Sequence, residues 1–359
     1  MNYKRKRRVK PIVVFGRVML SIGTAIVMLL VAVYSSAVVI AYGPSENMRN
    51  RLVLSALEAS ATKWAPYLVL PKSRVKKIMA DSKKTTVDET DVSNLDSDKA
   101  KNIQSDDNGL KLVYFTKPRF RGYLLIVDDA SRIKVGVSSE NFSTAVRGAR
   151  IFDIAKKYNC IAAINGGEFS DIGGQGSGAA PMGLTFSFGK KVWSDSLTRT
   201  FIGFDSQNKL ICTEGMTAKR AEELGIRDAV SFQNGNVLIS SENGKVKLFR
   251  ADNDLSTSQR TAIGQTEDGT VLMLVTDGRT GDSMGATRNE VIDILVEYGA
   301  VNAAMLDGGS SAMLYYRNYF DVYGVDKSTL DEYQLQGLVN KYKAFVPPRT
   351  IPTYFIVTD

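Results

Sequence analysis

Three apolar segments of this sequence each lead into polar residues beside glycine. These polar stretches are Asn165-Gly166-Gly167-Glu168, Thr276-Asp277-Gly278-Arg279 and Asp307-Gly308-Gly309-Ser310-Ser311. Carboxylates suit acid–base chemistry, and hydroxyls, amides and guanidinium groups suit the binding of polyhydroxyl or anionic ligands. Glycine permits positive φ and close backbone approach, so each turn can also present N–H groups to such a ligand.

Each of these turns is expected to follow a short buried strand, which positions the turn at the site. When parallel or mixed strands emerge at one edge of a sheet, the turns that follow them open a cleft there. A tight turn in which Asn or Asp tolerates local strain would explain any one of the three stretches. Three together favour a pocket.

A helix is predicted between Asp277 and Asp307. Thr287 and Glu290 form a capping box, and Gly299 ends the helix. Its apolar stripe is Val291, Ile292, Leu295 and Val296. A strand, a helix and a second strand form a unit whose crossover brings both carboxyl ends to one edge. We therefore expect the Asp277 and Asp307 carboxyl groups to lie within about 10 Å, a separation at which glycosidase carboxylates work.

The remaining signals predict a mixed β-sheet domain with flanking helices, of the α+β or α/β class. Strand patterns cover residues 110–115, 123–127 and 133–137, and hairpin turns occur at residues 189–190, 234–235 and 243–244. The chain has 359 residues, of which 44% are hydrophobic. That allows one large domain of roughly 250 residues, here 110–359, with accessory segments before it.

The N-terminus predicts a membrane anchor. Residues 18–42 are uncharged, mostly apolar and long enough to cross a bilayer. Residues 1–17 form a basic tail, which places the N-terminus in the cytoplasm and the domain outside, at the cell membrane. A cleaved signal peptide is the alternative, but this apolar run exceeds a usual signal core. Without the seven basic residues of the tail, the 46 Lys and Arg nearly balance the 38 Asp and Glu, which argues against nucleic-acid binding.

Residues 43–109 are predicted to contain membrane-proximal helices followed by a linker. The second helical pattern, residues 71–80, is basic and amphipathic. It could lie on anionic headgroups or form a solvated stalk, and the sequence leaves both readings open. Residues 82–109 are polar, rich in Asp and without aromatic side chains, which predicts a flexible linker.

The chain contains no histidine. This excludes a Ser-His-Asp triad, a Cys-His pair and a His-ligated zinc, so acid–base work must fall to carboxylates, Tyr or Lys. The two cysteines, Cys160 and Cys212, lie in apolar strand-like runs. That setting favours buried free thiols over a disulfide.

Six segments together resemble the phosphodiester glycosidase family in order and spacing, over residues 110–359. They are Ile164-Asn165-Gly166-Gly167, Pro181-Met182-Gly183-Leu184, Arg260-Thr261-Ala262-Ile263-Gly264, Thr276-Asp277-Gly278-Arg279, Leu306-Asp307-Gly308-Gly309-Ser310-Ser311 and Arg349-Thr350-Ile351-Pro352. Asp-Gly-Arg and Leu-Asp-Gly-Gly separated by one helix are the specific part. Three positions depart from the family pattern: Met305 replaces Asn, Ser310 replaces Gly, and Glu168 stands where Gly or an aromatic residue is common.

The resemblance implies a bacterial, membrane-anchored hydrolase that cleaves sugar-1-phosphodiester linkages in envelope or exopolysaccharide glycans. Its partner would be a carbohydrate or sugar-phosphate polymer, and it needs no cofactor. The implied catalytic residues are Asp307, Asp277 and Arg279. The implied substrate-binding residues are Asn165, Gly166, Gly167, Glu168, Arg260, Gly308, Gly309, Ser310 and Ser311.

Two other functions stay open. A metal-dependent phosphodiesterase would hold Ca²⁺ or Mg²⁺ with Asp277, Asp307 and loop carbonyls. Asp252-Asn253-Asp254 begins like an EF-hand loop, but Thr257 occupies the position that requires glycine. The third function, a non-catalytic polysaccharide-binding or envelope-scaffold module, would keep the cleft without turnover.

Overall fold

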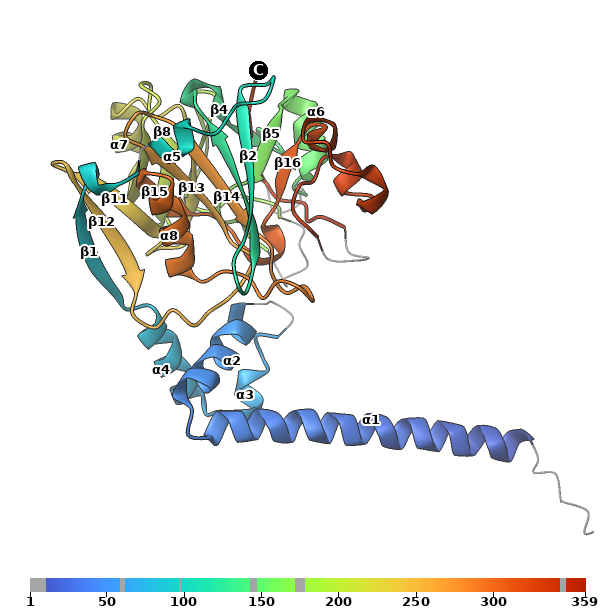
Figure 1. Ribbon diagram of the computed structural model, residues 1–359. Coiled ribbons are helices and arrows are strands. Elements are labelled where there is room, and N and C mark those ends of the chain that lie inside the picture. Colours follow the sequence, from blue (N-terminus) through green and yellow to red (C-terminus); the bar gives the residue numbers. More distant parts are fainter. Residues whose placement is uncertain (1–10, 59–61, 97, 143–146, 172–177, 343–346) are drawn as a thin grey trace, which may run out of the picture.

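The computed structural model describes residues 11–58, 62–96, 98–142, 147–171, 178–342 and 347–359. Three β-sheets with flanking helices form the main body, and a group of N-terminal helices lies beneath it (Figure 1). The predicted mixed class is therefore confirmed. Residues 1–10, with most of the predicted basic tail, lie outside the described residues.

The largest sheet has eight strands, and two of the predicted site segments lie at the ends of its strands. Its order is β1 (Thr85–Asp91), β12 (Lys245–Ala251), β11 (Val237–Glu242), β15 (Ala300–Met305), β13 (Thr261–Thr266), β14 (Val271–Thr276), β3 (Arg121–Val127) and β2 (Leu110–Thr116). The central strands β13 and β14 are buried along their whole length. Burial on both faces explains why β14 is a continuous apolar run rather than an alternating one.

Asp277 and Asp307 leave this sheet at the same edge, as predicted. β13 runs antiparallel between β14 and β15, and Ala262 pairs with both Leu274 and Met305. Strands two positions apart are separated by roughly 10 Å. The linking helix, α8 (Arg288–Glu297), has the predicted capping box, because the Thr287 hydroxyl accepts from the Glu290 N–H. The distance between the two carboxyl groups remains a prediction.

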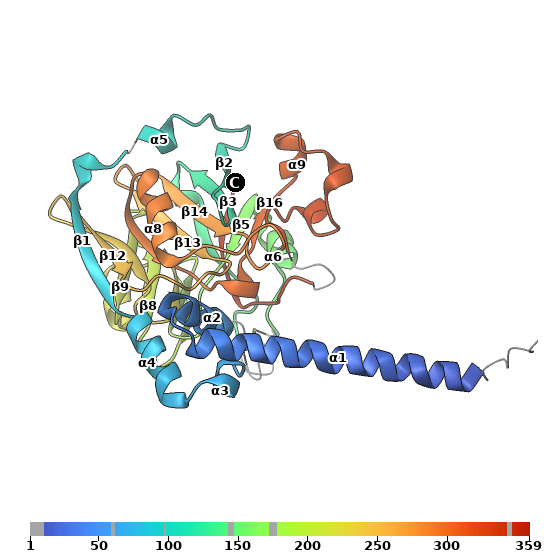
Figure 2. The ribbon, with the colours of Figure 1, turned by 60° about the horizontal axis from the view of Figure 1, so that its bottom comes forward.

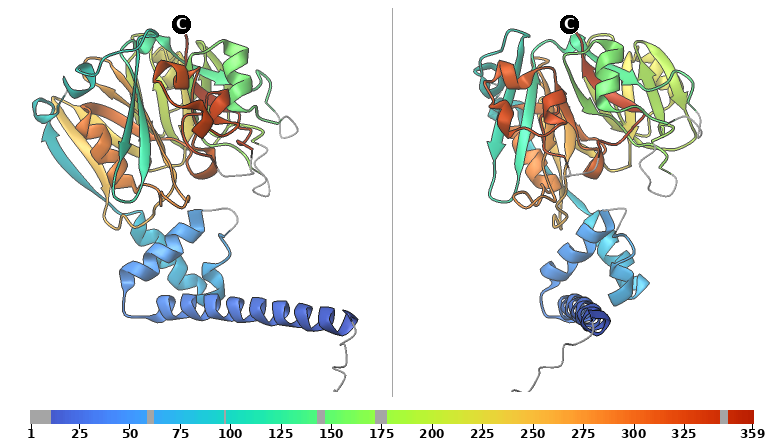
Figure 3. Two further views of the ribbon diagram at one scale, coloured as in Figure 1. Left: turned by 45° about the vertical axis from the view of Figure 1, so that its right-hand side comes forward. Right: turned by 90° about the vertical axis from the view of Figure 1, so that its right-hand side faces the viewer.

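Two smaller sheets complete the body (Figure 3). The five-stranded sheet has the order β7 (Lys190–Ser194), β6 (Leu184–Ser187), β10 (Asp228–Phe232), β8 (Thr200–Phe204) and β9 (Leu210–Glu214). The four-stranded sheet has the order β16 (Leu314–Tyr316), β5 (Ala162–Asn165), β17 (Thr353–Val357) and β4 (Ile133–Val137). One hydrophobic core joins side chains of all three sheets.

Short helices connect the strands. They are α5 (Asp98–Lys101), α6 (Ile151–Tyr158), α7 (Ala218–Glu223), α9 (Tyr319–Val322) and the 3-10 turns Val92–Asn94, Ala130–Arg132, Gly309–Ser311, Lys327–Thr329 and Gln334–Gln336. The turn Gly309–Ser311 follows Asp307 directly. Both cysteines are free, Cys160 in a buried position and Cys212 half-buried, as their apolar surroundings predicted.

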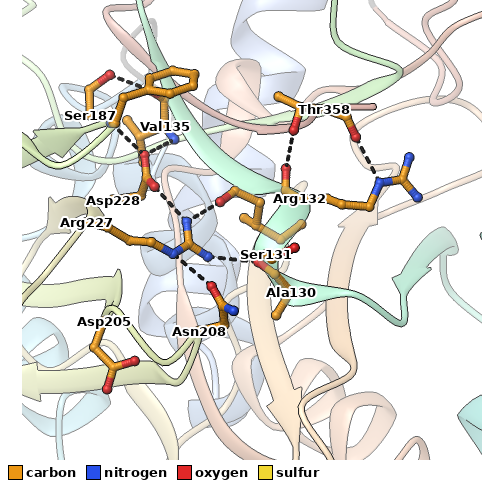
Figure 4. Close-up of polar contacts among 12 residues, drawn as sticks. Ala130, Ser131, Arg132, Val135, Ser187, Asp205, Asn208, Arg227, Asp228 and Thr358 are labelled. Atoms are coloured by element: carbon orange, nitrogen blue, oxygen red, sulfur yellow. Dashed lines mark hydrogen bonds and ion pairs between the residues drawn. The ribbon is translucent and has the colours of Figure 1, made fainter.

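A buried ion pair fastens the five-stranded sheet to the four-stranded one (Figure 4). The Arg227 guanidinium pairs with Asp228 at 2.6 Å and donates to the carbonyls of Ala130 and Ile133. Asp228 accepts from the Val135 N–H at 2.8 Å, and burial raises the pKa of its carboxyl group. The pair therefore bridges β10 and β4.

Arg227→Met should destabilise the protein by about 3 kcal/mol, because removing one partner leaves the other charge buried and unpaired. Chemical denaturation of the detergent-solubilised chain would measure the loss. The matched control is Arg220→Met, which breaks the exposed pair between Arg220 and Glu223. That change should cost less than about 1 kcal/mol. Equal losses in the two variants would contradict a role for the Arg227–Asp228 pair.

The N-terminal helices form a separate small core below the body (Figure 2). They are α1 (Pro11–Tyr42), α2 (Glu46–Glu58), α3 (Pro66–Val69) and α4 (Lys72–Ser82). Within the described residues, α1 is the one helix long and apolar enough to cross a membrane, a test that a signal sequence also passes. The helix begins seven residues before the predicted span. Ala41, Val53 and Val75 bury their side chains together, and Leu255 of the body packs against them.

The flexible linker predicted for residues 82–109 needs correction. Its first part is β1, which pairs with β12 from Thr85 opposite Ala251 to Asp91 opposite Lys245. Ala100, in α5, is buried in the main core. The strand is exposed along nearly its whole length, so its side chains are polar although its backbone is fully part of the sheet. Polar composition therefore concealed an edge strand, which backbone hydrogen bonds hold in place.

Candidate active site

The structure brings the turn after β5 against the turn after β15. The Asp307 N–H donates to the Gly166 carbonyl at 3.2 Å, and Asn165 Nδ2 donates to the Asp307 carbonyl at 2.5 Å. Asn165 Oδ1 accepts from the Thr261 hydroxyl at 2.8 Å and from the Met313 N–H at 3.1 Å. Asn165 is fully buried. It therefore braces the backbone of Asp307, and its amide is already engaged.

Close packing explains the glycines of these turns. A Cβ on Gly166 would lie 2.5 Å from Thr353 Oγ1, and one on Gly308 would lie 2.8 Å from the Gln259 carbonyl oxygen. Gly309 has a φ of +59°, which disfavours side chains. The Gly166 and Gly309 N–H groups donate to the backbone carbonyls of Thr353 and Gln259. These two N–H groups are thus occupied within the fold.

Asp307 lies half-buried at the centre of a charged group of side chains. Burial raises the pKa of its carboxyl group to about 6. A hydrogen bond from Ser311 and the positive charge of Arg349 lower that pKa, whereas the negative charge of Glu168 raises it. A carboxylate with a pKa close to neutrality can act as a base and remain ionised at physiological pH.

Glu168 belongs to this group and is shielded from most of the solvent. Its carboxylate forms an ion pair with Arg199 at 2.6 Å, and the two side chains are only 17% and 20% exposed. The Glu168 N–H donates to the Ser231 carbonyl, which fixes the backbone beside the five-stranded sheet. The sequence placed Glu168 in the site but contained no signal for Arg199.

Arg349 is the cation next to Asp307, and sequence reasoning had assigned it no role. Its Nη1 donates to Ser310 Oγ at 3.2 Å and lies 3.4 Å from Ser311 Oγ. Its other terminal nitrogen pairs with Asp171, and the guanidinium carbon lies 5.2 Å from the centre of the Phe169 ring. The available signal was its position at the start of the Arg-Thr-Ile-Pro segment of the family resemblance.

Arg279 and Arg260, which the family resemblance assigns to catalysis and to substrate binding, make contacts within the fold. Arg279 donates to the Ser55 carbonyl of α2 at 3.1 Å. Arg260 donates to the backbone carbonyls of Ala286 at 3.1 Å and Ser256 at 2.8 Å. These contacts hold loops and the N-terminal helices, so a phosphate would have to compete with them.

Asp277 is buried at the same sheet edge but faces a different segment. Its Oδ1 accepts from the Lys341 N–H at 3.1 Å, and its Oδ2 has no hydrogen-bond partner among the described residues. Burial raises the pKa of its carboxyl group to about 7. Tyr342, which follows Lys341 in the chain, donates to the Ser310 carbonyl and accepts from the Arg349 N–H. Asp277 therefore supports the segment that holds Ser310 and Arg349.

A small cavity lies between the turn that follows Asp307 and the segment that contains Lys341 and Tyr342. It has a volume of about 10 Å³ and is lined by Gln259, Thr280, Gly309, Ser310, Ala312, Lys341 and Tyr342. That is room for about one water molecule. The Gln259 Oε1 atom is buried without a hydrogen-bond partner among the described residues. The edge thus retains an unsatisfied acceptor beside the serine turn.

No group of three or more His, Cys, Asp or Glu side chains in the described ranges is arranged to hold a metal ion. Asp254, in the segment that begins like an EF-hand loop, accepts from the N–H groups of Arg288 and Asn289 at 3.1 and 2.7 Å. It therefore caps α8. The described structure offers the metal-dependent alternative no carboxylate cluster.

The fold and the site define a mixed α/β protein with a partly desolvated carboxylate near two arginine–carboxylate pairs. The chain belongs to the phosphodiester glycosidase family, whose model matches residues 158–358. Glu168, Arg199, Asp307 and Arg349 all lie within the matched region. Family membership confirms the resemblance and places the chain among the hydrolases of this family.

Individual relatives share only part of the chain or only its fold. The SPbeta prophage-derived uncharacterized protein YomE of Bacillus subtilis (strain 168) is 30% identical over 113 residues, which cover 30% of this chain and 17% of that protein. The zebrafish N-acetylglucosamine-1-phosphodiester alpha-N-acetylglucosaminidase catalytic domain, auto-inhibited by its pro-peptide, has a TM-score of 0.51 at 18% identity, covering 76% of this chain and 88% of that one. A putative exported protein of Burkholderia pseudomallei K96243 has a TM-score of 0.45 at 12% identity, covering 67% and 74%. The zebrafish match shows a shared fold.

Proposed function

We propose that this protein hydrolyses sugar-1-phosphodiester linkages in envelope or exopolysaccharide glycans. One observation carries the proposal: Asp307, with its pKa raised to about 6, lies beside Glu168 and Arg349 within the family-matched region. The zebrafish protein of similar fold is named for the same class of bond. In this proposal α1 anchors the chain in the cell membrane and residues 110–359 lie outside, an orientation supported by the basic residues before Val18.

The chemistry of this bond matches the residues around Asp307. Cleavage at the anomeric carbon expels a phosphate monoester, so little general-acid help is required. The transition state needs a carboxylate near the oxocarbenium-like carbon and hydrogen-bond donors or cations on the departing phosphate. Asp307 supplies the carboxylate, as nucleophile or as base for water. Arg349, together with the hydroxyls of Ser310 and Ser311, supplies the phosphate site.

The remaining candidates support this centre. Glu168 keeps a negative charge near Asp307, which raises the pKa of Asp307 and makes its carboxylate more basic. Arg199 holds Glu168 in place. Asp277 is a positioning residue, because its hydrogen bond to Lys341 orders the segment that contains Tyr342. Arg279 donates to the Ser55 carbonyl of α2, and Arg260 donates to the Ala286 carbonyl, so both stabilise backbone segments around the site.

Glu168→Gln should shift the pH profile of the enzyme. Loss of the negative charge lowers the pKa of Asp307, so the acidic limb of the kcat/KM profile moves to lower pH. The weaker base should also reduce kcat/KM by less than about tenfold at neutral pH. The control Glu222→Gln removes an exposed carboxylate that pairs with Lys191 and should change neither quantity. An acidic limb that stays at the wild-type position in Glu168→Gln would contradict this role.

Product identification on a panel of sugar-1-phosphodiesters tests the reaction itself. The full-length, detergent-solubilised chain should release free sugar and a phosphate monoester. Release of sugar 1-phosphate and an alcohol, with loss of activity in a chelator, would instead support a metal-dependent phosphodiesterase. Binding of polymer without any release would support a non-catalytic module.

A further inference from the structure

The membrane-proximal unit, residues 43–84, has a charge opposite to that of the body. It contains nine Lys and Arg but only three Asp and Glu, whereas residues 85–359 contain 30 Lys and Arg and 35 Asp and Glu. Lys72, Lys76 and Lys77 of α4 are all exposed. The positive charge that remains outside the N-terminal tail is therefore concentrated beside the apolar helix.

The same unit exposes large apolar and aromatic side chains. Trp64 and Leu68 are each 60% exposed and Tyr67 is 41% exposed, all at or next to the short helix α3. In Figures 1 and 2, α3 lies beside the C-terminal turns of α1, and the two helices are in contact. Tyr42, the last residue of α1, is also exposed, and the Arg74 guanidinium lies 6.0 Å from the centre of its ring. Aromatic and basic side chains thus gather where the apolar helix ends.

The membrane-proximal unit is also firmly attached to the body. Val53, Leu70, Val75 and Ile78 form its core, and Leu255 of the body packs against that core. β1 begins three residues after α4 and pairs with β12 along its length. A free stalk would have neither attachment. Leu255 and β1 therefore connect the unit to the body.

We propose that the membrane-proximal unit binds the anionic headgroups of the lipid bilayer in which α1 is anchored. This proposal rests on the anchoring part of the proposed function. Aromatic side chains favour the membrane–water interface, and lysine clusters favour anionic lipid surfaces. Trp64, Tyr67 and Leu68 enter the interface, while Lys72, Lys76 and Lys77 contact headgroup phosphates. Because Arg279 binds the Ser55 carbonyl of α2, the loop after Asp277 is held to the same unit.

Tryptophan fluorescence can test the contact directly, because the chain has only two tryptophans, Trp64 and Trp193. Trp193→Phe leaves Trp64 as the reporter. The full-length variant is placed in nanodiscs of phosphatidylcholine alone or mixed with phosphatidylglycerol. We expect Trp64 emission to shift to shorter wavelength in the mixed discs and to be quenched by lipids brominated near the headgroup. High salt should weaken this response.

Charge variants identify the source of the response. Changing Lys72, Lys76 and Lys77 to Gln should reduce the quenching, since each basic residue near an anionic surface is worth roughly a fivefold change in the docking equilibrium. The control changes three exposed lysines of the body, Lys190, Lys209 and Lys219, to Gln and should leave the quenching unchanged. Water-like Trp64 emission without quenching in both disc types, from a chain that has entered the discs, would overturn the proposal. A chain that does not enter the discs would also refute anchoring, and glycosidase activity measured in the same samples is judged separately.

Discussion

Asp307→Asn is expected to reduce turnover by about three to four orders of magnitude while the fold survives. Asparagine keeps the shape of the side chain and can still accept the hydrogen bond from Ser311, but it cannot act as base or nucleophile. Initial rates on a sugar-1-phosphodiester and thermal melting of the same preparation would measure the two effects. A variant that melts like the wild type and still releases sugar at nearly the wild-type rate would show that Asp307 is structural.

The pH dependence of melting provides a second readout for the same variant. The pKa of Asp307 is about 6 in the folded protein and 3.8 in the reference state. A raised pKa stabilises the fold fully below pH 3.8, and this contribution is lost as the pH rises through about 6. Above pH 6, Asp307→Asn should therefore be at least as stable as the wild type. A lower melting temperature for the variant at pH 8 would contradict the electrostatic description of the site.

Asp277→Asn is the matched comparison at the end of β14. Asp277 is also buried and also has a raised pKa, but it holds the Lys341 segment instead of facing Arg349. As a positioning residue it should lose much less turnover than Asp307. Equal losses in both variants at unchanged melting temperature would make Asp277 a second catalytic carboxylate.

Arg349→Met is expected to lower kcat/KM on sugar-1-phosphodiesters by about a hundredfold to a thousandfold, the scale for losing one preorganised donor to a developing charge. Arg349→Lys should recover only part of the activity, because lysine keeps the charge but lacks the planar donor fork. A nitrophenyl glycoside of the same sugar has no phosphate. The loss on that substrate should be small, and an equal loss on both substrates would contradict a phosphate-binding role.

Two controls separate this effect from stability and from the other arginines. Combining Arg349→Met with Asp171→Asn removes both partners of the ion pair, so melting should recover while activity stays low. Arg279→Met breaks the contact with Ser55 and should leave activity in detergent close to the wild-type value.

Several properties of the site could be predicted from short stretches of sequence. The sequence placed Asp277 and Asp307 at one sheet edge, from the apolar runs, the Thr287–Glu290 capping box and the single helix between them. The antiparallel pairing of β13 with both β14 and β15 agrees with that placement. Turn glycines were also recognised correctly as positions of close backbone approach. Periodicity, capping and turn chemistry are local, so neighbouring residues contain the necessary information.

The sequence by itself determined the strand ends, the linking helix, the apolar N-terminal helix and the absence of histidine chemistry. Only the tertiary structure decided which charges surround Asp307, because Glu168 and Arg349 reach it from turns that are distant in the chain. It also decided that Asn165 is a brace, that Arg279 binds α2, and that the polar residues of β1 form an edge strand. Such contacts depend on strand pairing and packing over long sequence separations, and composition and spacing do not encode them.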